Sequence, residues 1–290
     1  MSTTLSGKVI IVTGAGAGIG AATARYLAAE GAAVVVNDLA GADAVVAEIC
    51  GAGGRAIANA DSVASWEGAR RMVAAGLAAW GRLDGVVNNA GIVRDGMFHK
   101  MSEDDWDAVI GVHLKGTFCL CRAAAEPFRA QGSGAFVNMT STSGLIGNLG
   151  QANYAAAKLG IVALTRAIAL DMQRFGVRAN AIAPFAWTAM TATIPQSDDP
   201  KQQARIARLQ QLRPEHIAPM VAFLLGDGAA AINGQVFAVR GDEISLFALP
   251  LPVRTLRRAG GWTVAALAAE LPEALRPDLV PLRVTADVFQ

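Results

Sequence analysis

The sequence contains few aromatic and charged side chains. Only 6% of its 290 residues are aromatic and 17% are charged, whereas 53% are hydrophobic. A disordered protein or a scaffold has the opposite balance, so this composition favours a well-packed α/β or helical enzyme with a small-molecule substrate. The 25 Lys and Arg residues nearly cancel the 24 Asp and Glu residues, and no basic run is interleaved with aromatic residues. We therefore expect no nucleic-acid partner.

Cysteine and long apolar runs are also scarce. Cys50, Cys119 and Cys121 are odd in number and lack the spacing of a disulfide framework or a metal site, so we interpret them as reduced thiols in the core. The N-terminus has no charged segment followed by an apolar one, and no uninterrupted apolar run reaches the roughly 18 residues of a membrane span. These absences predict a cytoplasmic protein with no metal site and no membrane partner.

Apolar, β-branched runs alternate with helical segments along the first 240 residues. The run "VIIVTG" leads through glycines into the helical "AATARYLAAEG", and a second run, "AAVVVNDL", follows. Apolar runs without strict alternation are typical of strands that helices cover on both faces. Five further strands are predicted at 55–61, 83–91, 134–141, 177–184 and 234–239. Seven strands alternating with helices predict an α/β protein with a doubly wound parallel sheet.

The pattern changes after residue 241, where prolines punctuate short amphipathic pieces such as "WTVAALAAEL". We expect a dinucleotide-binding and catalytic domain at 1–244 and a C-terminal extension at 245–290. The extension would expose an apolar patch if it stayed in solvent, so we favour docking across the body of the enzyme or a partner subunit over a disordered end. The residues of this patch are Leu246, Phe247, Leu249, Leu251, Trp262, Val264 and Leu267.

The stretch "TGAGAGIG" at 13–20 follows the first predicted strand and opens the first helix. Backbone N–H groups and the positive end of the helix dipole would meet a pyrophosphate there, and glycine lets the chain approach it closely. A tight turn without a ligand is the alternative. We expect Gly14, Gly18, Ile19 and Gly20 to bind a dinucleotide.

Asp38 ends the second predicted strand, 18 residues beyond Gly20. A carboxylate at this point accepts hydrogen bonds from the ribose hydroxyls of adenosine and repels a 2′-phosphate. Ala15, Ala17 and the "LAG" after Asp38 offer no positive charge to a phosphate. The sequence therefore predicts NAD rather than NADP.

Tyr154 and Lys158 lie four residues apart at the start of an Ala-rich run, so a helix would place them on one face. A neighbouring ammonium favours the phenolate and lowers the pKa of a tyrosine towards the range of a working base. An ordinary amphipathic surface pair is the alternative. The spacing makes Tyr154 a candidate general base.

Together, "TGAGAGIG", "NNAG" at 88–91, Ser141 and "YAAAK" at 154–158 resemble the short-chain dehydrogenase/reductase family over about residues 6–240. The resemblance implies an extended Rossmann fold, usually as a homodimer or homotetramer. It implies Tyr154 as general acid/base, Lys158 as the residue that lowers its pKa and holds the nicotinamide ribose, and Ser141 as the partner of the reacting oxygen. Ser143 and a helix-capping role are alternatives for Ser141, but its spacing of thirteen residues before Tyr154 favours Ser141.

The same resemblance extends to further positions. It implies that Asp61 and Ser62 contact the adenine, that Asn89, Ala90 and Gly91 line the ribose, and that Thr188 touches the carboxamide; turn and cap roles are the alternatives for the first five. His113 stands where family members commonly carry an asparagine of a proton relay, so it either takes part in a relay or packs. Pro184–Phe185 replaces the usual Pro-Gly.

Within the family, "VVVNDL", "NNAGIVRDGMF", "VHLKGTF" and "GNLGQANYAAAKLG" look most like the (3R)-hydroxyacyl-CoA dehydrogenase unit of peroxisomal multifunctional enzymes and their bacterial relatives. This resemblance implies an NAD-dependent oxidoreductase that interconverts a secondary alcohol and a ketone, with a 3-hydroxyacyl-CoA-type substrate. A hydroxysteroid or alicyclic alcohol dehydrogenase is one alternative, and a non-catalytic NAD-sensing subunit is another.

Overall fold

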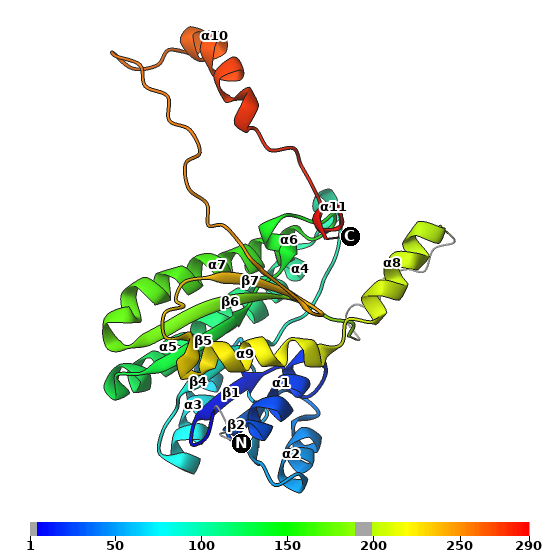
Figure 1. Ribbon diagram of the computed structural model, residues 1–290, viewed down its shortest axis with the longest axis vertical. Coiled ribbons are helices and arrows are strands. Elements are labelled where there is room, and N and C mark those ends of the chain that lie inside the picture. Colours follow the sequence, from blue (N-terminus) through cyan, green and yellow to red (C-terminus); the bar gives the residue numbers. More distant parts are fainter. Residues whose placement is uncertain (1–4, 189–198, 290) are drawn as a thin grey trace.

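An eight-stranded sheet runs through the computed structural model, which describes residues 5–188 and 199–289 (Figure 1). Its strands, in spatial order, are β3 (Arg55–Asn59), β2 (Ala33–Asn37), β1 (Val9–Thr13), β4 (Gly85–Asn88), β5 (Gly134–Met139), β6 (Val177–Phe185), β7 (Val236–Arg240) and β8 (Glu243–Leu246). The first seven strands in the sequence are parallel, and β8 pairs antiparallel with β7. The predicted doubly wound fold is confirmed, with β8 as an addition.

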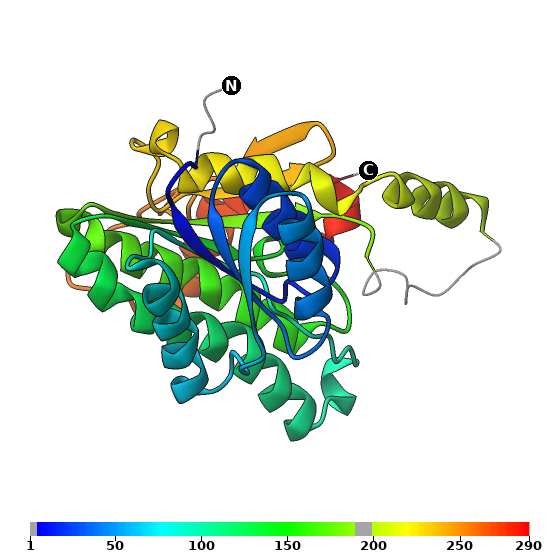
Figure 2. The same ribbon diagram turned by 90° about the horizontal axis from the view of Figure 1, so that it is seen from below.

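Helices cover both faces of this sheet (Figure 2). One face carries α1 (Gly18–Ala29), α2 (Ala42–Gly51) and α9 (Ala218–Leu225), and the other carries α3 (Trp66–Trp80), α5 (Gly116–Gln131) and α7 (Ala152–Met172). Successive residues of β1 therefore enter different cores: Ile10 packs with α1, whereas Ile11 packs with α3 and α5. All five residues of β1 are buried, which explains why its sequence does not alternate.

The remaining helices are shorter or lie outside the two layers. They are α4 (Glu103–Ile110), the π-helical turn η2 (Gly111–Lys115), α6 (Thr142–Leu145), α8 (Pro200–Gln210), α10 (Val264–Leu275) and α11 (Thr285–Val288). Single 3₁₀ turns are η1 (Phe98–Lys100), η3 (Gln173–Phe175), η5 (Pro214–His216), η6 (Asp227–Ala229) and η7 (Arg276–Asp278). The continuous helical stretch Glu103–Gln131 is long and apolar enough to cross a membrane by length and composition. Leu120 and Phe128 of this stretch are fully buried against the sheet, as in the core helix of a globular domain.

The prediction of three core thiols holds for Cys119 and Cys121, which are buried, and is wrong for Cys50, which is exposed. Cys50 lies near the end of α2, directly after Ile49, which faces the core. Adjacent helical residues point about 100° apart, so the neighbour of a buried residue turns towards solvent.

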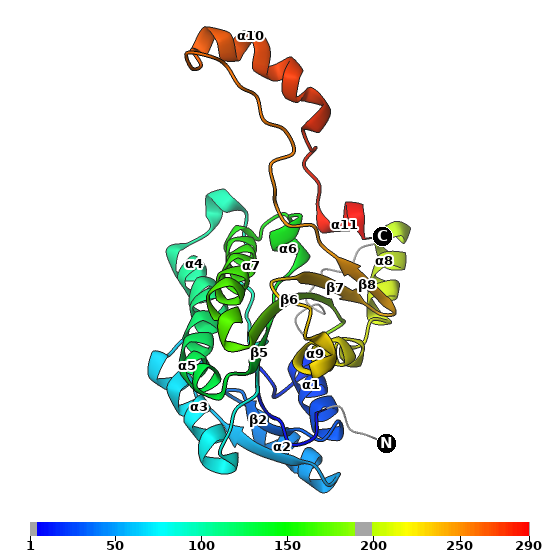
Figure 3. The same cartoon turned by 60° about the vertical axis from the view of Figure 1, so that its left-hand side comes forward.

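The chain beyond β8 leaves the body as a long arm that carries α10 at its far end (Figures 1 and 3). It returns to the body at α11, where the Thr285 N–H donates to the Gly147 carbonyl at 3.0 Å. The Phe289 ring then packs on Phe185, with ring centroids 4.9 Å apart. The body of the same chain thus receives both ends of the extension but not α10. Docking of the extension on a partner subunit stays a prediction.

Candidate active site

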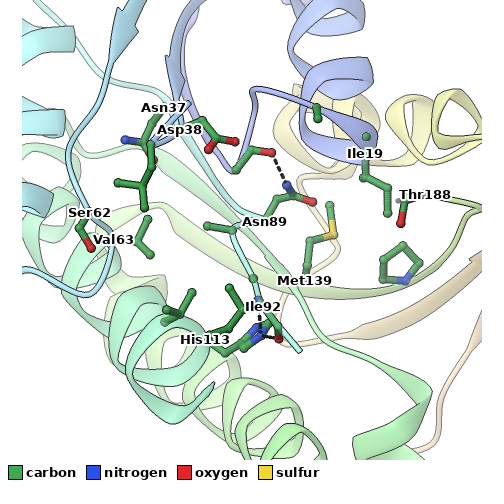
Figure 4. A pocket seen from close by; sticks show the side chains of 18 of the residues that line it. Ile19, Asn37, Asp38, Ser62, Val63, Asn89, Ile92, His113, Met139 and Thr188 are labelled. Carbon is green, nitrogen blue, oxygen red and sulfur yellow. Dashed lines mark hydrogen bonds between the residues drawn. The ribbon is translucent and has the colours of Figure 1, made fainter. Parts of the chain in front are cut away.

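A cavity of about 400 Å³ opens where the sheet reverses its order between β1 and β4. In doubly wound sheets the crevice outside the carboxyl ends of the strands at such a switch point is where ligands bind. Thirteen of the expected site residues line it: Gly14, Gly18, Ile19, Asp38, Asp61, Ser62, Asn89, Ala90, Gly91, His113, Tyr154, Lys158 and Thr188. Gly20 and Ser141 are not part of this lining. Figure 4 shows Asp38 and Ser62 on one side of the cavity and Met139 and Thr188 on the other.

At Gly14 and Gly20 the glycine loop is packed too closely for a side chain. A Cβ at Gly14 would lie 2.7 Å from the Ala90 Cα, and one at Gly20 would lie 2.1 Å from the Gly14 carbonyl oxygen. Gly20 therefore lets α1 pack closely on the loop, although Gly20 itself does not line the cavity. The N-cap residue Ala17 lines the cavity and provides no side-chain hydrogen bond to the first turn of α1. The first N–H groups of α1 are thus not capped by this residue, an arrangement that suits an anion such as a pyrophosphate.

Asn89 holds this loop to the end of β4. Its side-chain amide donates to the carbonyls of Thr13 and Gly14 at 3.0 and 3.1 Å, and its own N–H donates to the Thr13 hydroxyl. The Ala90 N–H donates to the same hydroxyl at 3.1 Å. Asn89 and Ala90 therefore fix the wall of the cavity as well as lining it.

Asp38 sits at the end of β2 on the rim of the cavity. One carboxylate oxygen accepts the Gly16 N–H at 2.9 Å, and the other accepts the Ala40 N–H at 3.3 Å. The neighbouring side chain, Leu39, is 72% exposed and uncharged. Among the described residues that line the cavity, the only lysine or arginine is Lys158, which comes from α7 rather than from this rim. An anion bound beside Asp38 would meet a negative charge.

The Asp61 carboxylate accepts more hydrogen bonds from side chains of the protein than the sequence indicated. Arg71 donates to one carboxylate oxygen at 2.5 and 2.9 Å, and Asn59 donates to the other at 2.9 Å. The Arg71 hydrogen bond holds the pKa of Asp61 below its ordinary value. Its backbone carbonyl accepts from the buried amide of Asn37 at 2.9 Å. The carboxylate thus fixes the wall of the cavity beside Asn37, with exposed Ser62 next to it, and contact of either residue with an adenine stays a prediction.

Tyr154, Lys158 and Ser141 come together from α7 and the segment that follows β5. The Lys158 ammonium donates to the Met139 carbonyl at 2.7 Å and lies 5.4 Å from the centre of the Tyr154 ring. Ser141 caps α6 by accepting the Ser143 N–H at 3.1 Å, and it also hydrogen-bonds the Tyr154 phenol. The capping alternative therefore describes a contact that Ser141 makes, and its role beside the reacting oxygen stays a prediction.

Burial dominates the ionisation of this group. It raises the pKa of Tyr154 to about 12 against the opposing effect of the Ser141 hydrogen bond, and it lowers the pKa of Lys158 to about 7. The expected lowering of the tyrosine pKa by Lys158 is therefore wrong for the protein alone. Desolvation disfavours both the phenolate and the ammonium, so at neutral pH Lys158 carries its charge in only about half of the molecules.

Asn153 orients the start of α7, a role that the sequence did not indicate. Its buried amide donates to the carbonyls of Arg94 and Asp105 at 2.9 and 3.1 Å, and its oxygen accepts the Tyr154 N–H at 2.7 Å. One side chain thereby connects α7 to the loop after β4 and to α4. The position directly before Tyr154 is the only sequence signal that could have pointed to it.

His113 projects from the π-helical turn η2, a type of irregularity that is frequent at functional sites. It is 2% exposed, and its Nε2 atom lies 2.7 Å from the Ile92 carbonyl oxygen and 3.0 Å from the Ile92 nitrogen. Burial, assisted by the nearby Lys158, lowers the pKa of His113 to about 3. The ring meets Tyr154 edge-on, with centroids 5.1 Å apart, and a Cβ at Gly91 would lie 2.3 Å from it. The packing alternative accounts for these contacts, because a neutral ring fixes the 91–92 loop.

Thr188 lies over the first turn of α1, since a Cβ at Gly18 would be 3.5 Å from its methyl group. Residues 189–198 of the substrate-side loop fall outside the described part of the chain. On the other side of Tyr154, a polar cluster of Ser143, Asn148, Gln151 and Asp95 was not foreseen. Gln151 joins it by accepting from the Ser143 hydroxyl at 2.9 Å and donating to Asp95 at 3.0 Å.

Comparison with known proteins agrees with this geometry. A family model described as enoyl-(acyl carrier protein) reductase matches residues 14–241. The hydroxyacyl-CoA dehydrogenase ChsB1 of Mycobacterium tuberculosis is 44% identical over 93% of this chain and 89% of its own. The peroxisomal multifunctional enzyme type 2 of Mus musculus is 42% identical over 80% of this chain and 31% of its own.

Among solved structures, a short chain dehydrogenase from Mycobacterium avium has 38% identity and a TM-score of 0.85, and the match covers 97% of this chain and 98% of that one. The relatives carry different substrate names, but their names describe reductases or dehydrogenases, and the TM-score of 0.85 shows that the solved structure shares the fold of this chain. From the order of its strands, the contents of its cavity and these similarities, the chain belongs to the short-chain dehydrogenase/reductase family.

Proposed function

We propose that this protein interconverts a secondary alcohol and a ketone with NAD as the hydride carrier. One observation carries the proposal: Tyr154 and Lys158 share a single cavity with the glycine loop and Asp38. A dinucleotide fits the residues present, because the cavity offers a helix start that Ala17 leaves uncapped, a close-packed loop and a carboxylate at the end of β2. When bound, the nicotinamide supplies a hydride acceptor for oxidation or a hydride donor for reduction.

Tyr154 moves the proton of the substrate oxygen. In reduction its phenol would donate a proton to the carbonyl oxygen, and in oxidation its phenolate would accept the hydroxyl proton. Ser141, hydrogen-bonded to the same phenol, holds the substrate oxygen beside it. With a pKa raised to about 12, Tyr154 is protonated at neutral pH, which is the form that reduction requires.

Asp38 favours NAD over NADP. Its carboxylate is fixed in place by the Gly16 and Ala40 N–H groups, and neither Leu39 nor any other described residue on this rim of the cavity offers a cation to a 2′-phosphate. A ribose with two free hydroxyls can donate to the carboxylate, whereas a phosphate is repelled by it.

For the substrate we propose a 3-hydroxyacyl-CoA-type thioester. The support is the similarity to a hydroxyacyl-CoA dehydrogenase over 93% of this chain, which extends well past the family match that ends at residue 241.

The test is a panel of substrates whose oxidation is measured by the absorbance of NADH. The panel contains 3-hydroxyacyl-CoA thioesters of both configurations, a hydroxysteroid and a simple cyclic alcohol. We expect kcat/KM for one thioester to exceed that of the other compounds by at least about tenfold, or about 1.4 kcal/mol. A higher value for the steroid or the cyclic alcohol would favour the alternative substrate class. Tight NAD binding without turnover of any compound would instead indicate an NAD-sensing subunit, and Tyr154→Phe serves as the inactive control.

A further inference from the structure

Residues 284–289, here called the C-terminal turn, contact two segments that border the cavity at its Tyr154 end. The Thr285 N–H and hydroxyl both donate to the Gly147 carbonyl, at 3.0 and 3.3 Å. At the other end of the turn, the Phe289 ring packs on the Phe185 ring, with centroids 4.9 Å apart. Gly147 lies in the loop after α6, and Phe185 is the last residue of β6. The C-terminal turn therefore connects two segments that lie far apart in the sequence.

The first of these segments begins at Ser141. Ser141 caps α6, and the Gly147 N–H donates back to the Thr142 carbonyl at 3.2 Å, so Gly147 is hydrogen-bonded to the helix that Ser141 opens. Gly147 has a φ of +133°, and a Cβ at this position would lie 3.3 Å from the Arg283 carbonyl oxygen. The chain that enters the C-terminal turn thus packs closely on the backbone of the Ser141 segment.

The second segment carries Pro184 and Thr188, which both line the cavity. Phe185 directly follows Pro184 and stands where family members commonly carry a glycine. A glycine would offer no side chain for Phe289 to contact. The departure from the usual Pro-Gly pattern therefore supplies the contact between this wall of the cavity and the C-terminal turn.

Phe247 supports the Phe289 ring from the body of the molecule, with ring centroids 6.3 Å apart. Phe247 itself packs against a small apolar cluster that joins α7, β6 and β7, formed by Val162, Ala181 and Val236. The Phe289 ring therefore rests on the helix that carries Lys158 and on the strand that carries Pro184.

The C-terminal turn has its own internal hydrogen bonds. The Val284 N–H donates to the Asp287 carboxylate at 2.8 Å, and the Phe289 N–H donates to the Thr285 carbonyl at 3.0 Å. At about 1.5 Å per helical residue, the two contact points are held about 6 Å apart along the turn. A shift of one contacted segment is therefore transmitted to the other.

We propose that Thr285 and Phe289 are positioning residues for the substrate, because they fix the Ser141 segment relative to the segment of Pro184 and Thr188. The inference rests on the proposed function, under which the substrate oxygen lies beside Tyr154 and the rest of the substrate lies between these two segments. Figure 4 shows Asp38 on the opposite side of the cavity from Thr188. The C-terminal turn should therefore govern the binding of the substrate more than that of the dinucleotide.

Hydrogen exchange tests the connection without any assay of activity. Phe289→Ala removes the ring contact, and we expect the amide hydrogens of Gly147 and Trp187, each bonded within its own segment, to exchange at least about tenfold faster. The amide hydrogen of Ala15 in the glycine loop should exchange as in the wild type. Val288→Ala is the matched control, because Val288 lies in the same turn, is 46% exposed and should leave both rates unchanged. Unchanged exchange at either Gly147 or Trp187, or equal acceleration at Ala15, overturns the proposal.

Steady-state kinetics with the best thioester of the panel test the effect on the substrate. Phe289→Ala should raise KM for the thioester at least about tenfold and leave kcat and the calorimetric affinity for NAD within about threefold of wild type, as expected when substrate binding alone is lost. Phe289→Leu keeps an apolar contact with Phe185 and should restore most of the wild-type KM. Phe185→Ala should match Phe289→Ala, and the double variant should be no worse than either, because all three lose one contact.

Two kinetic outcomes overturn the positioning role: independent, additive effects of the two alanine substitutions, or a loss of NAD affinity as large as the rise in KM. A wild type that turns over none of the compounds refutes the proposed function instead. In that case hydrogen exchange at Gly147 and Trp187 still decides whether the C-terminal turn fixes the two segments.

Discussion

Replacing Asp38 with asparagine isolates one charge at the adenosine end of the cavity. The Gly16 N–H donates to one carboxylate oxygen at 2.9 Å, and an asparagine oxygen in the same place can keep that bond, while only the longer 3.3 Å bond from the Ala40 N–H is lost. The substitution therefore removes repulsion without opening the rim. Under the proposed function, NADP would bring its 2′-phosphate against this side chain.

The size of the effect follows from Coulomb's law. Two unit charges about 4 Å apart repel by about 1 kcal/mol in water and by about 4 kcal/mol at an effective dielectric constant of about 20. A phosphate monoester carries about 1.5 to 2 negative charges, so its repulsion by Asp38 is about 2 to 8 kcal/mol. Because Asp38 is only half-buried, the lower end applies, and about 2 kcal/mol corresponds to about thirtyfold in kcat/KM.

Initial rates with NAD and NADP at a fixed substrate concentration measure this preference. We expect wild type to favour NAD by at least about tenfold and Asp38→Asn to reduce that ratio by at least about tenfold. Adding Leu39→Arg should move the preference further, to NADP, by supplying a phosphate partner. Asp43→Asn removes the same charge from the exposed first turn of α2 and should leave the ratio unchanged. An unaltered ratio in Asp38→Asn, or an equal change in Asp43→Asn, would refute the reasoning.

Three further predictions concern the residues around the catalytic helix. Tyr154→Phe should lower kcat by at least about a hundredfold and leave NAD binding, measured by calorimetry, nearly unchanged. Lys158→Ala should lower both kcat and the affinity for NAD. If Tyr154→Phe kept its activity, another group would have to move the proton. Asn153→Leu should lower the free energy of unfolding, measured in urea, by about 3 kcal/mol or more, because it leaves backbone groups of Arg94, Asp105 and Tyr154 unpaired. The control Asn148→Leu, on an exposed loop, should lower it by less than about 1 kcal/mol. The pKa of His113 is lowered from 6.5 to about 3, so only the unfolded chain binds this proton as pH falls below about 6.5, and stability is lost. Between pH 7 and pH 5 wild type should lose about 2 kcal/mol more than His113→Asn, and equal losses would contradict the buried, neutral histidine.

The strands were predictable because each buried strand is a short apolar run with helices on either side. β8 was not, because its four residues are mostly exposed and carry no apolar run, and it exists only through pairing with β7. The C-terminal extension was predictable in part. Its amphipathic pieces indicated docking, but a sequence does not tell whether an apolar face meets its own chain or another, since that depends on where Phe247 and Thr285 anchor the ends.

Site residues were predictable where one local pattern carries the chemistry. The glycine loop and Asp38 belong to a single βαβ unit, so their spacing indicated a shared cavity. Asn37 and Asn153 were missed because their partners lie elsewhere in the sequence: Asn37 binds the carbonyl of Asp61, and Asn153 binds the carbonyls of Arg94 and Asp105. The sequence alone does not distinguish these two asparagines from other polar residues, because the carbonyls that they bind come close only in the folded chain.

The ionisation of Tyr154 is the point at which spacing alone gave the wrong sign. A helix fixed the tyrosine and Lys158 on one face, but burial of both groups, which no spacing reveals, raises the first pKa and lowers the second. At neutral pH the buried pair therefore rests as a phenol beside an amine that is charged in about half of the molecules. Under the proposed function, the phenol would donate a proton to a carbonyl oxygen, whereas oxidation of an alcohol would need the phenolate. The positive charge of an oxidised nicotinamide ring in the same cavity would favour that phenolate, so the redox state of the cofactor would decide whether Tyr154 acts as an acid or as a base.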